Sequence, residues 1–290
     1  MKTAFDCIPC FIRQATESIA MAAGDEQQSE GLLRRLLHEI AETDWNVMPV
    51  SIAQRIQRLI RKETGQTDPY RSLKDRMNRA ALDLLPALTA TLRQSRDPRE
   101  AATRLAIAGN LLDAGSKSRL DIDELEKRLK SVWDAPLDGN VTDLFQAAEA
   151  AHCILYLADN AGEIVFDRLL IEALPAEKIT VAVRGMPVIN DATLDDAEIA
   201  GIPEVAPVFG NGSDAPGTIV EECSDEFKYW FNRADMIIAK GQGNYETLAD
   251  IDRNIYFLLT VKCPIIGAEV NAPVGAMIVK PGRECHADSC

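Results

Sequence analysis

The turn that follows the apolar run Cys153–Ala158 carries side chains that could bind a metal ion. It reads Asp159-Asn160-Ala161-Gly162-Glu163 and holds two carboxylates, one amide and a glycine that frees the backbone. Oxygen ligands of this kind suit a hard or borderline divalent cation such as Mg²⁺ or Mn²⁺. Taken alone, the turn is more typical of a helix N-cap, with Asp159 or Asn160 as the cap and Glu163 in the first helical turn.

The next apolar run, Ile179–Val183, is followed by a Gly/Pro loop that begins at Arg184. Asn190 and Asp191 end this loop, directly before an expected helix. Asp191 can cap that helix, or it can be a third metal ligand that faces Asp159. Arg184 can hold an anion at the strand end, or it can be a surface arginine. This loop is the first reason to interpret the earlier turn as more than a cap.

A third turn follows the run Met236–Ala239 and reads Lys240-Gly241-Gln242-Gly243-Asn244-Tyr245-Glu246. Two glycines and two amides at a strand-to-helix turn can wrap a phosphate with backbone N–H groups at the helix N-terminus. The turn lacks the order of a Walker A loop and the glycine pattern of a dinucleotide site. The residues we predict to contact phosphate here are Gly241, Gln242, Gly243 and Asn244.

Lys262 follows the apolar run Ile255–Thr260 and stands among apolar neighbours. A buried ammonium group without a partner is costly, so this lysine must reach water or a negative group. A phosphate-binding lysine and a lysine that extends to solvent at a strand edge fit its spacing about equally. The adjacent Cys263 is more typical of a small core residue than of a nucleophile.

The histidines and cysteines give little support to other hydrolase chemistries. The three histidines, His38, His152 and His286, are scattered, which disfavours a catalytic triad or a His-rich zinc site. The pair Cys7-Ile-Pro-Cys10 has the spacing of a metal or redox site. Structural thiols are the first interpretation. The second is a further metal site completed by Cys285, His286 and Cys290 if the termini meet, and redox catalysis ranks last.

The composition excludes several partners. Of the 290 residues, 47% are apolar and 26% are charged, and the formal net charge is −14. The nearest approach to a basic patch, Arg55–Lys62, has the spacing of a solvated helix face, so neither nucleic acid nor an anionic membrane is expected as a partner. With no signal sequence or apolar span, we expect a cytoplasmic protein whose seven cysteines are reduced. The sequence specifies no oligomeric state.

The residues before 140 predict helices, because apolar side chains recur at three- and four-residue spacing. The expected helices are Phe11–Ala23, Leu32–Ala41, Ile52–Arg61, Leu73–Leu92, Ala101–Leu112 and Asp121–Val132. Pro86 is expected to kink or split the longest of them. A turn-rich linker, Pro136–Asn140, separates this helical domain (1–140) from a second domain (141–290).

The second domain alternates short apolar runs with helical segments. The expected strands are Cys153–Ala158, Ile179–Val183, Val205–Phe209, Met236–Ala239, Ile255–Thr260 and Ala276–Val279. The expected helices are Glu163–Ala173, Ala192–Ala200, Glu221–Asn232 and Tyr245–Asp250. This alternation predicts an α/β fold with a mainly parallel sheet. Since ligands of open α/β sheets bind beyond the carboxyl ends of the strands, the polar turns should share one edge.

Seven motifs in order resemble the damage-control phosphatases, also called domain of unknown function 89. They are Cys7-Ile-Pro-Cys-Phe-Ile-Arg-Gln, Asp68-Pro-Tyr70 with Lys74 and Asn78, Ala108-Gly-Asn-Leu-Leu-Asp113, Asp159-Asn-Ala-Gly-Glu163, Asn190-Asp-Ala-Thr193, Lys240-Gly-Gln-Gly-Asn-Tyr-Glu246 and Lys262-Cys-Pro264. They span nearly the whole chain. The Cys-x-x-Cys start is similar to subfamily I of that family.

The resemblance implies a helical domain that caps a three-layer α/β/α domain, and hydrolysis of small phosphate monoesters. It implies a divalent metal (Mn²⁺, Co²⁺, Ni²⁺ or Mg²⁺) with Asp159, Asn160 and Asp191 as ligands. Lys262 falls in the slot of the family's Arg-Thr-x-Lys motif. That slot reads Leu259-Thr-Val-Lys262 here, without the arginine.

The function predicted from these residues is metal-dependent hydrolysis of a small phosphorylated metabolite, such as a sugar phosphate, a nucleotide or a cofactor precursor. Water or the Asp159 carboxylate would be the nucleophile, and Glu163 or Asp191 the general base. Lys262 and the Gly241–Asn244 turn would stabilise the phosphoryl charge. A non-catalytic phosphometabolite-binding protein is the alternative, and methyl transfer from S-adenosylmethionine ranks last. Candidate cleft residues that would set specificity are Asp68, Tyr70, Lys74, Asn78, Asn110 and Asp113.

Overall fold

The centre of the protein is a seven-stranded sheet in the order β1-β7-β6-β5-β2-β3-β4. The computed structural model describes residues 1–109 and 132–282. The strands are β1 (Leu137–Gly139), β2 (Ile154–Leu157), β3 (Ile179–Val183), β4 (Val208–Gly210), β5 (Met236–Lys240), β6 (Ile255–Thr260) and β7 (Met277–Pro281). Neighbouring strands are parallel except β6 and β7, which are antiparallel. The predicted α/β class is confirmed.

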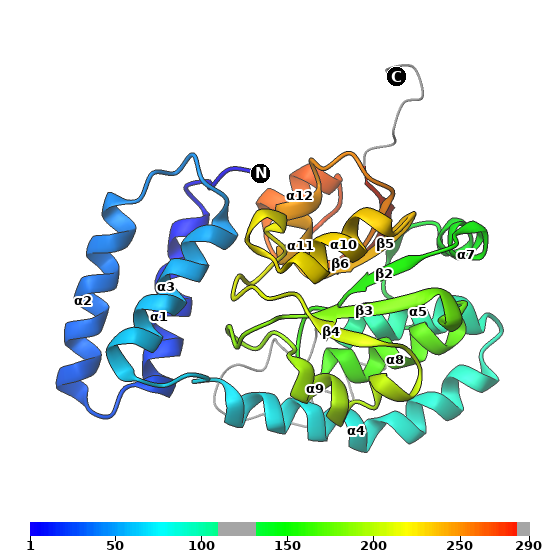
Figure 1. Ribbon diagram of the computed structural model, residues 1–290, viewed down its shortest axis with the longest axis horizontal. Helices are drawn as coiled ribbons and strands as arrows, with labels where there is room; N and C mark the ends of the chain where they lie inside the picture. Colours follow the sequence, from blue (N-terminus) through cyan, green and yellow to red (C-terminus); the bar gives the residue numbers. More distant parts are fainter. Residues whose placement is uncertain (110–131, 283–290) are drawn as a thin grey trace.

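Both faces of the sheet are covered, and alternate residues of its inner strands enter two different cores. In β2, Ile154 and Tyr156 face one core, and Leu155 and Leu157 face the other. The first core is closed by α4 (Arg71–Gln94), α5 (Pro98–Ala108), α7 (Val141–Ala150), α8 (Glu163–Ala173) and α9 (Leu194–Ile199). The second is closed by α10 (Asp225–Arg233), α11 (Gly241–Leu248) and α12 (Pro264–Val270). The three layers are visible in Figure 1.

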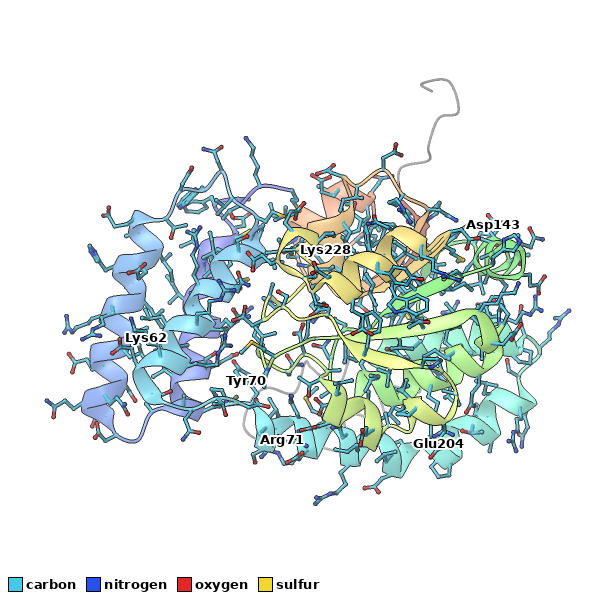
Figure 2. The ribbon with its side chains drawn as sticks, viewed as in Figure 1. Lys62, Tyr70, Arg71, Asp143, Glu204 and Lys228 are labelled. Atoms are coloured by element: carbon cyan, nitrogen blue, oxygen red, sulfur yellow. The ribbon has the colours of Figure 1, made fainter. Side chains whose placement is uncertain are left out.

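The first three helices, α1 (Cys7–Ala22), α2 (Glu26–Glu42) and α3 (Pro49–Thr64), form a group with its own core. We call α1–α3 the three-helix group. Asp25 caps α2 by accepting a hydrogen bond from the Gln28 amide, and α3 ends at Gly65, whose φ of 70° suits a left-handed C-cap. Lys62 lies on this group in Figure 2, and Tyr70 and Arg71 mark the connection to α4.

Most predicted elements are present, with a few differences. Strand β1 lies inside the predicted linker, and α7 and α12 were not predicted. Helix α4 continues through Pro86, whose exposed position leaves the unpaired carbonyl one turn earlier to water. The predicted helix Asp121–Val132 lies almost entirely outside the described residues. Within the described chain, every helix is too short or too polar to cross a bilayer.

The stretch Arg55–Lys62 is only partly a solvated helix face, which corrects the prediction. Arg58 and Arg61 both pair with Asp214, and the Arg61 side chain is only 15% exposed. The physical reason is tertiary, because this side of α3 meets the loop after β4. The boundary near residue 140 stays a prediction. Helices α4 and α5, which precede it, pack into the same core as the sheet.

Candidate active site

The predicted polar turns meet between β2 and β5, where the order in which strands are added to the sheet changes from one side to the other. Strands β2 and β5 are neighbours; β3 and β4 extend the sheet on one side, and β6 and β7 on the other. Such a switch point leaves a crevice beyond the carboxyl ends of the two strands. The turn after β2 begins at Asp159, and the turn after β5 begins at Gly241. A Cβ atom on Gly241 would lie 1.9 Å from Asp159 Oδ2, so the two turns are in contact.

Asp159, Asn160 and Asp191 lie together, as the sequence predicted. Asn160 and Asp191 form an isolated β-bridge, and the Ala192 amide donates to the Asp159 carbonyl at 2.8 Å. The three residues are at most 8% exposed. Asn160 Nδ2 donates to Asp159 Oδ2 at 2.8 Å and to Glu163 Oε2 at 2.9 Å. The amide oxygen of Asn160 therefore points away from both carboxylates.

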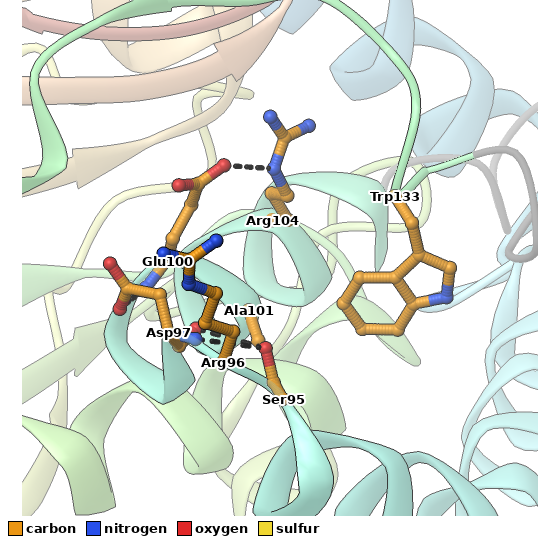
Figure 3. Close-up of a pocket in the computed structure, with 7 residues that line it drawn as sticks. All are labelled: Ser95, Arg96, Asp97, Glu100, Ala101, Arg104 and Trp133. Carbon is orange, nitrogen blue, oxygen red and sulfur yellow. Dashed lines mark hydrogen bonds and ion pairs between the residues drawn. The ribbon is translucent and has the colours of Figure 1, made fainter.

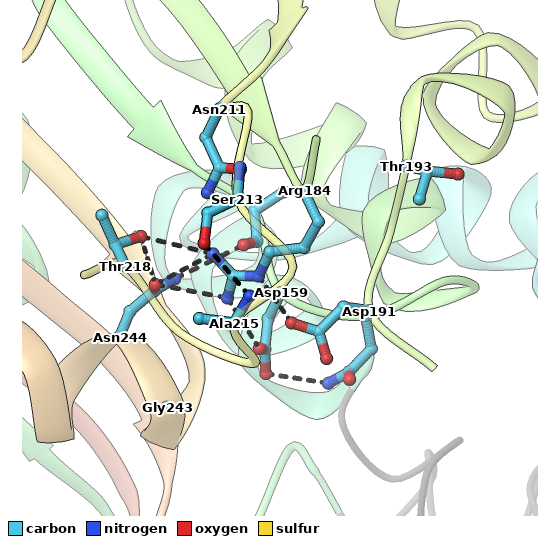
Figure 4. A network of polar contacts seen from close by, with 12 residues as sticks. Asp159, Arg184, Asp191, Thr193, Asn211, Ser213, Ala215, Thr218, Gly243 and Asn244 are labelled. Atoms are coloured by element: carbon cyan, nitrogen blue, oxygen red, sulfur yellow. Dashed lines mark hydrogen bonds and ion pairs between the residues drawn. The ribbon is translucent and has the colours of Figure 1, made fainter. Parts of the chain in front are cut away.

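Arg184 is buried beside these residues and contacts several of them (Figure 4). Its Nε donates to Asp191 Oδ2 at 2.6 Å, and one terminal nitrogen lies 3.9 Å from Asp159 Oδ1. The other contacts of its guanidinium group go to Thr218 Oγ1 at 3.2 Å and Asn244 Oδ1 at 3.3 Å. Arg184 thus fixes the orientation of Asp191 and brings a positive charge next to two carboxylates.

Lys240, the last residue of β5, has a buried ammonium group that the sequence did not place in the site. Its Nζ donates to Glu163 Oε1 and the Ala106 carbonyl at 2.8 Å, and to Asp167 Oδ1 at 2.5 Å. Tyr156 also donates to Asp167, at 2.8 Å. The available signal was the spacing of Glu163 and Asp167, which are four residues apart and therefore share one face of α8.

The buried charges do not balance. Within this cluster, in the part of the chain that the structure describes, four buried carboxylates (Asp159, Glu163, Asp167 and Asp191) face two buried cations (Arg184 and Lys240). Burial raises the pKa of Asp159 well above its usual range, and the charges of Glu163 and Asp191 add to this effect. Burial also raises the pKa of Asp167 to about 6, although Lys240 opposes the shift. The cluster is therefore suited to a further positive charge.

The donor set fits the metal that the resemblance implies. Two carboxylates and one amide oxygen are hard ligands, which suit Mg²⁺ or Mn²⁺. Within residues 1–109 and 132–282, this cluster included, no three His, Cys, Asp or Glu side chains are grouped as a metal site, so the ligand set has two carboxylates and depends on the Asn160 amide. Cys7 and Cys10 lie at the start of α1, and their predicted partners Cys285, His286 and Cys290 are outside the described residues.

Lys262 and the predicted phosphate turn lie on the open side of the site. Lys262 is exposed, and its charge lowers the pKa of Asp159 against the effect of burial. Its backbone amide donates to Gln242 Oε1 at 3.3 Å. Gly241 and Gly243 begin α11, so their amide groups are among the first of that helix, which have no partner within it. Asn244 is buried and donates to the Lys240 carbonyl at 2.8 Å.

Lys74 and Asn78, predicted as cleft residues, are buried in contacts with other residues of the protein, and Asn78 contacts the Asp159 turn directly. Lys74 is fully buried, with its Nζ 3.0 Å from Asp196 and 3.2 Å from Asp68. Asn78 accepts a hydrogen bond from the Gly162 amide at 2.6 Å and donates to Asp196 at 2.8 Å. Tyr70 is also buried, with its hydroxyl group 2.6 Å from Ser18. The predicted residues Asn110 and Asp113 lie outside the described residues.

A polar hollow of about 520 Å³ lies elsewhere, where α4 connects to α5 (Figure 3). It is lined by Ser95, Arg96, Asp97, Glu100, Ala101, Arg104 and Trp133. Within it, Arg104 pairs with Glu100 at 2.7 Å. These residues do not belong to the strand-end turns. We therefore base the functional interpretation on the Asp159 cluster.

Comparison with known proteins agrees with the geometry. The family model of the damage-control phosphatase ARMT1-like domain matches residues 3–278. The chain belongs to the damage-control phosphatase family. A damage-control phosphatase from Archaeoglobus fulgidus is 33% identical, over 97% of this chain and 99% of that protein. One from Pyrococcus horikoshii is 34% identical, over 96% of this chain and 97% of that protein.

The fold of this damage-control phosphatase family member is also that of a solved relative. The crystal structure of a DUF89 family protein from Pyrococcus horikoshii superimposes with a TM-score of 0.88. The two chains are 30% identical, and the match covers 98% of this chain and 100% of the other. An uncharacterised protein of Methanocaldococcus jannaschii is 35% identical, over 93% of this chain and 92% of that protein. The family membership supports phosphatase activity in metabolite repair.

Proposed function

We propose that this protein is a metal-dependent phosphatase that hydrolyses small phosphate monoesters. The observation that carries the proposal is the meeting of Asp159, Asn160 and Asp191 at the switch point, in a cluster with more buried carboxylates than cations. Sugar phosphates, nucleotides and cofactor-related phosphometabolites are the substrate classes, and metabolite repair is the role. The family membership of the chain supports this proposal.

A divalent cation such as Mn²⁺ or Mg²⁺ would be held by Asp159, Asn160 and Asp191, and Co²⁺ or Ni²⁺ are alternatives. When bound, it supplies a Lewis acid that polarises the phosphoryl group. The surrounding residues hold the ligands in place. Glu163 fixes the amide group of Asn160, and Arg184 fixes the carboxylate of Asp191. Such contacts behind the ligands are general features of metal sites in enzymes.

The phosphoryl group would lie on the open side of the cluster, between Lys262 and the start of α11. The backbone amides of Gly241, Gln242 and Gly243 form the positive N-terminal end of that helix, where phosphate binds favourably. Lys262 adds a positive charge at the solvent-exposed side. Together these groups stabilise the charge on the phosphoryl oxygens as the ester bond breaks.

The hydrogen bonds of Glu163 make it a poor candidate for the nucleophile or the general base. Asp159 and Asp191 are the better candidates. Glu163 Oε1 accepts from Lys240, and Oε2 accepts from Asn160. Both oxygens are therefore already engaged in hydrogen bonds that hold the cluster together. We assign Glu163 to that role, and leave the Asp159 carboxylate and a water molecule as the two candidate nucleophiles.

The test is hydrolysis of p-nitrophenyl phosphate by the purified protein with Mn²⁺. We expect turnover that stops with EDTA and returns with Mn²⁺, and a loss of at least about a hundredfold in kcat for Asp159→Asn. Asp195→Asn is the matched control, because that carboxylate is 78% exposed and pairs with Arg71 outside the cluster. Full activity of Asp159→Asn with Mn²⁺ contradicts the proposal.

The alternative from the sequence, a phosphometabolite-binding protein without turnover, makes a different prediction for the same protein. It would bind phosphorylated metabolites but release no phosphate at any concentration of Mn²⁺. A screen of phosphorylated metabolites with detection of inorganic phosphate separates the two and names the preferred substrate class.

A further inference from the structure

One face of α3 is directed at a single buried carboxylate in the loop after β4. Gln54, Arg58 and Arg61 are spaced by four and three residues, so they share one face of the helix. Gln54 Nε2 donates to Asp214 Oδ1 at 2.8 Å, and Arg58 pairs with the same oxygen at 2.6 Å. Arg61 forms an ion pair with the other oxygen, Oδ2. Both oxygens of Asp214 are therefore held by the three-helix group.

Arg61 also reaches a second loop, the one that carries the predicted metal ligand. Its other terminal nitrogen donates to the Pro187 carbonyl at 2.9 Å. Pro187 lies between Arg184 and Asp191, in the loop after β3. One side chain of the three-helix group thus joins the loops after β3 and β4, whereas Arg58 bonds only to carboxylates of the segment that follows β4.

The two loops are also tied directly to each other. Asn211 Oδ1 accepts from the Gly185 amide at 2.8 Å and from the Ser213 amide at 2.9 Å. The backbones approach so closely that a Cβ atom on Gly185 would lie 2.3 Å from Gly212. In the same segment Thr218 donates to Asn244 at 2.8 Å and accepts from Arg184. A shift of Asp214 would therefore be transmitted to the neighbours of Asp191.

The loop that Arg61 holds is strained beside Asp191. Ile189 has a φ of 45°, a region that β-branched residues rarely occupy. Such a conformation persists only where the surrounding structure imposes it. The bond from Arg61 to Pro187 lies two residues before Ile189, and the β-bridge of Asp191 with Asn160 lies two residues after it.

We infer that the three-helix group completes the active site, with Arg61 as a positioning residue for the loop Arg184–Asp191. The expected change in the Kd for Mn²⁺ rests on the proposed function. Arg61 acts on Asp191 indirectly, because its guanidinium group contacts Pro187 and Asp214. Removal of its two contacts frees the loop to relax from the strained form.

The experiment compares Arg61→Gln and Arg61→Lys with Arg58→Gln, which removes an equal charge from Asp214 but leaves the Pro187 bond in place. Hydrogen exchange over residues 185–192 is measured without metal, together with the Kd for Mn²⁺ by calorimetry. We expect Arg61→Gln to raise both the exchange rates and the Kd about tenfold. Arg61→Lys should recover part of the loss, and Arg58→Gln should change each by a clearly smaller factor than Arg61→Gln, because it loosens Asp214 but leaves the Pro187 bond in place.

Thermal unfolding shows whether each variant is folded. If Arg61→Gln does not fold, Arg61→Lys takes its place in the comparison with Arg58→Gln. Equal effects of Arg58→Gln and Arg61→Gln on the exchange rates and the Kd would overturn the inference, because they would mean that Arg61 acts only through its charge on Asp214. No effect of either variant would also overturn it. If the wild-type protein neither binds Mn²⁺ nor cleaves p-nitrophenyl phosphate, the proposed function fails. The exchange rates over residues 185–192 then still decide the role of Arg61.

Discussion

At the scale of single residues, the orientation of the Asn160 amide group depends on Glu163. Both hydrogens of the amide are donated to carboxylates, one on Asp159 and one on Glu163. In Glu163→Gln, one side-chain end must face Lys240 and the other Asn160. Because the ammonium group of Lys240 only donates, the new amide places its oxygen there and its NH₂ group against the NH₂ of Asn160.

For Glu163→Gln we therefore expect the Kd for Mn²⁺ to rise about ten- to a hundredfold, since Asn160 must rotate. Calorimetric titration of the purified variant measures the change. Glu172→Gln is the control, because Glu172 lies on the same helix but is half-exposed and pairs with Arg168. An unchanged Kd for Glu163→Gln would show that Asn160 is oriented by other contacts or is not a ligand.

The site residues that the sequence predicts lie in the turns and loops that follow strands. Asp159, Arg184 and Asp191 follow buried runs, so their place at the carboxyl edge could be predicted from the alternation of runs and turns. Asp167 and Asp214 were missed because their partners are far away in the sequence. Asp167 meets Lys240 73 residues later, and Asp214 meets Arg61 153 residues earlier. Distances of this kind depend on the assembled fold.

At the scale of elements, the start of α11 is shaped by the space that Asp159 needs. Gly241 has a φ of 79°, and a Cβ atom there would meet Asp159 Oδ2 at 1.9 Å. We expect Gly241→Ala to lower kcat/KM at least about a hundredfold, because a displacement of about 1 Å is enough to cause such a loss. Kinetics with p-nitrophenyl phosphate and Mn²⁺ measure the effect.

Gly65→Ala is the matched control for this prediction. Gly65 has a φ of 70° but open space around its Cβ position, so alanine there has the same backbone strain without the clash. It should lower stability by about 1 kcal/mol and leave kcat/KM within about twofold. Similar losses of activity in both variants would mean that backbone strain, and not the displacement of Asp159, explains the result.

The elements that escaped prediction are short or depend on distant partners. Helix α7 had a local signal, since Asn140 accepts from the amides of Thr142 and Asp143 as an N-cap, but the prediction treated Asn140 as the end of a linker. Helix α12 has seven residues, fewer than two full helical turns. Strand β1 has three residues and pairs with β7, about 140 residues away, so its sequence alone cannot define it.

At the scale of the whole molecule, Asp214 links the three-helix group to the sheet, and the link should depend on pH. Burial alone raises the pKa of Asp214, but the hydrogen bonds from Arg58 and Gln54 and the charges of Arg58 and Arg61 outweigh burial. The pKa of Asp214 therefore lies below its ordinary value of 3.8. A carboxylate with a lowered pKa stabilises the fold above that ordinary value, and the stabilisation is lost as the pH falls through the lowered pKa.

Asp214→Asn should consequently be less stable than the wild-type protein at pH 7, and the difference should shrink as the pH falls below about 4. Urea unfolding at several pH values measures it, with tryptophan fluorescence as the signal, since Trp45 lies next to the three-helix group. Asp195→Asn is the control, because its exposed pair with Arg71 contributes little and is screened by salt.

A deficit that stays constant down to pH 3 would mean that Asp214 acts through its hydrogen bonds and not through its charge. A midpoint that changes only in the fluorescence of Trp45, measured with Trp133 and Trp230 replaced by phenylalanine, would show that the three-helix group separates from the sheet before the sheet unfolds.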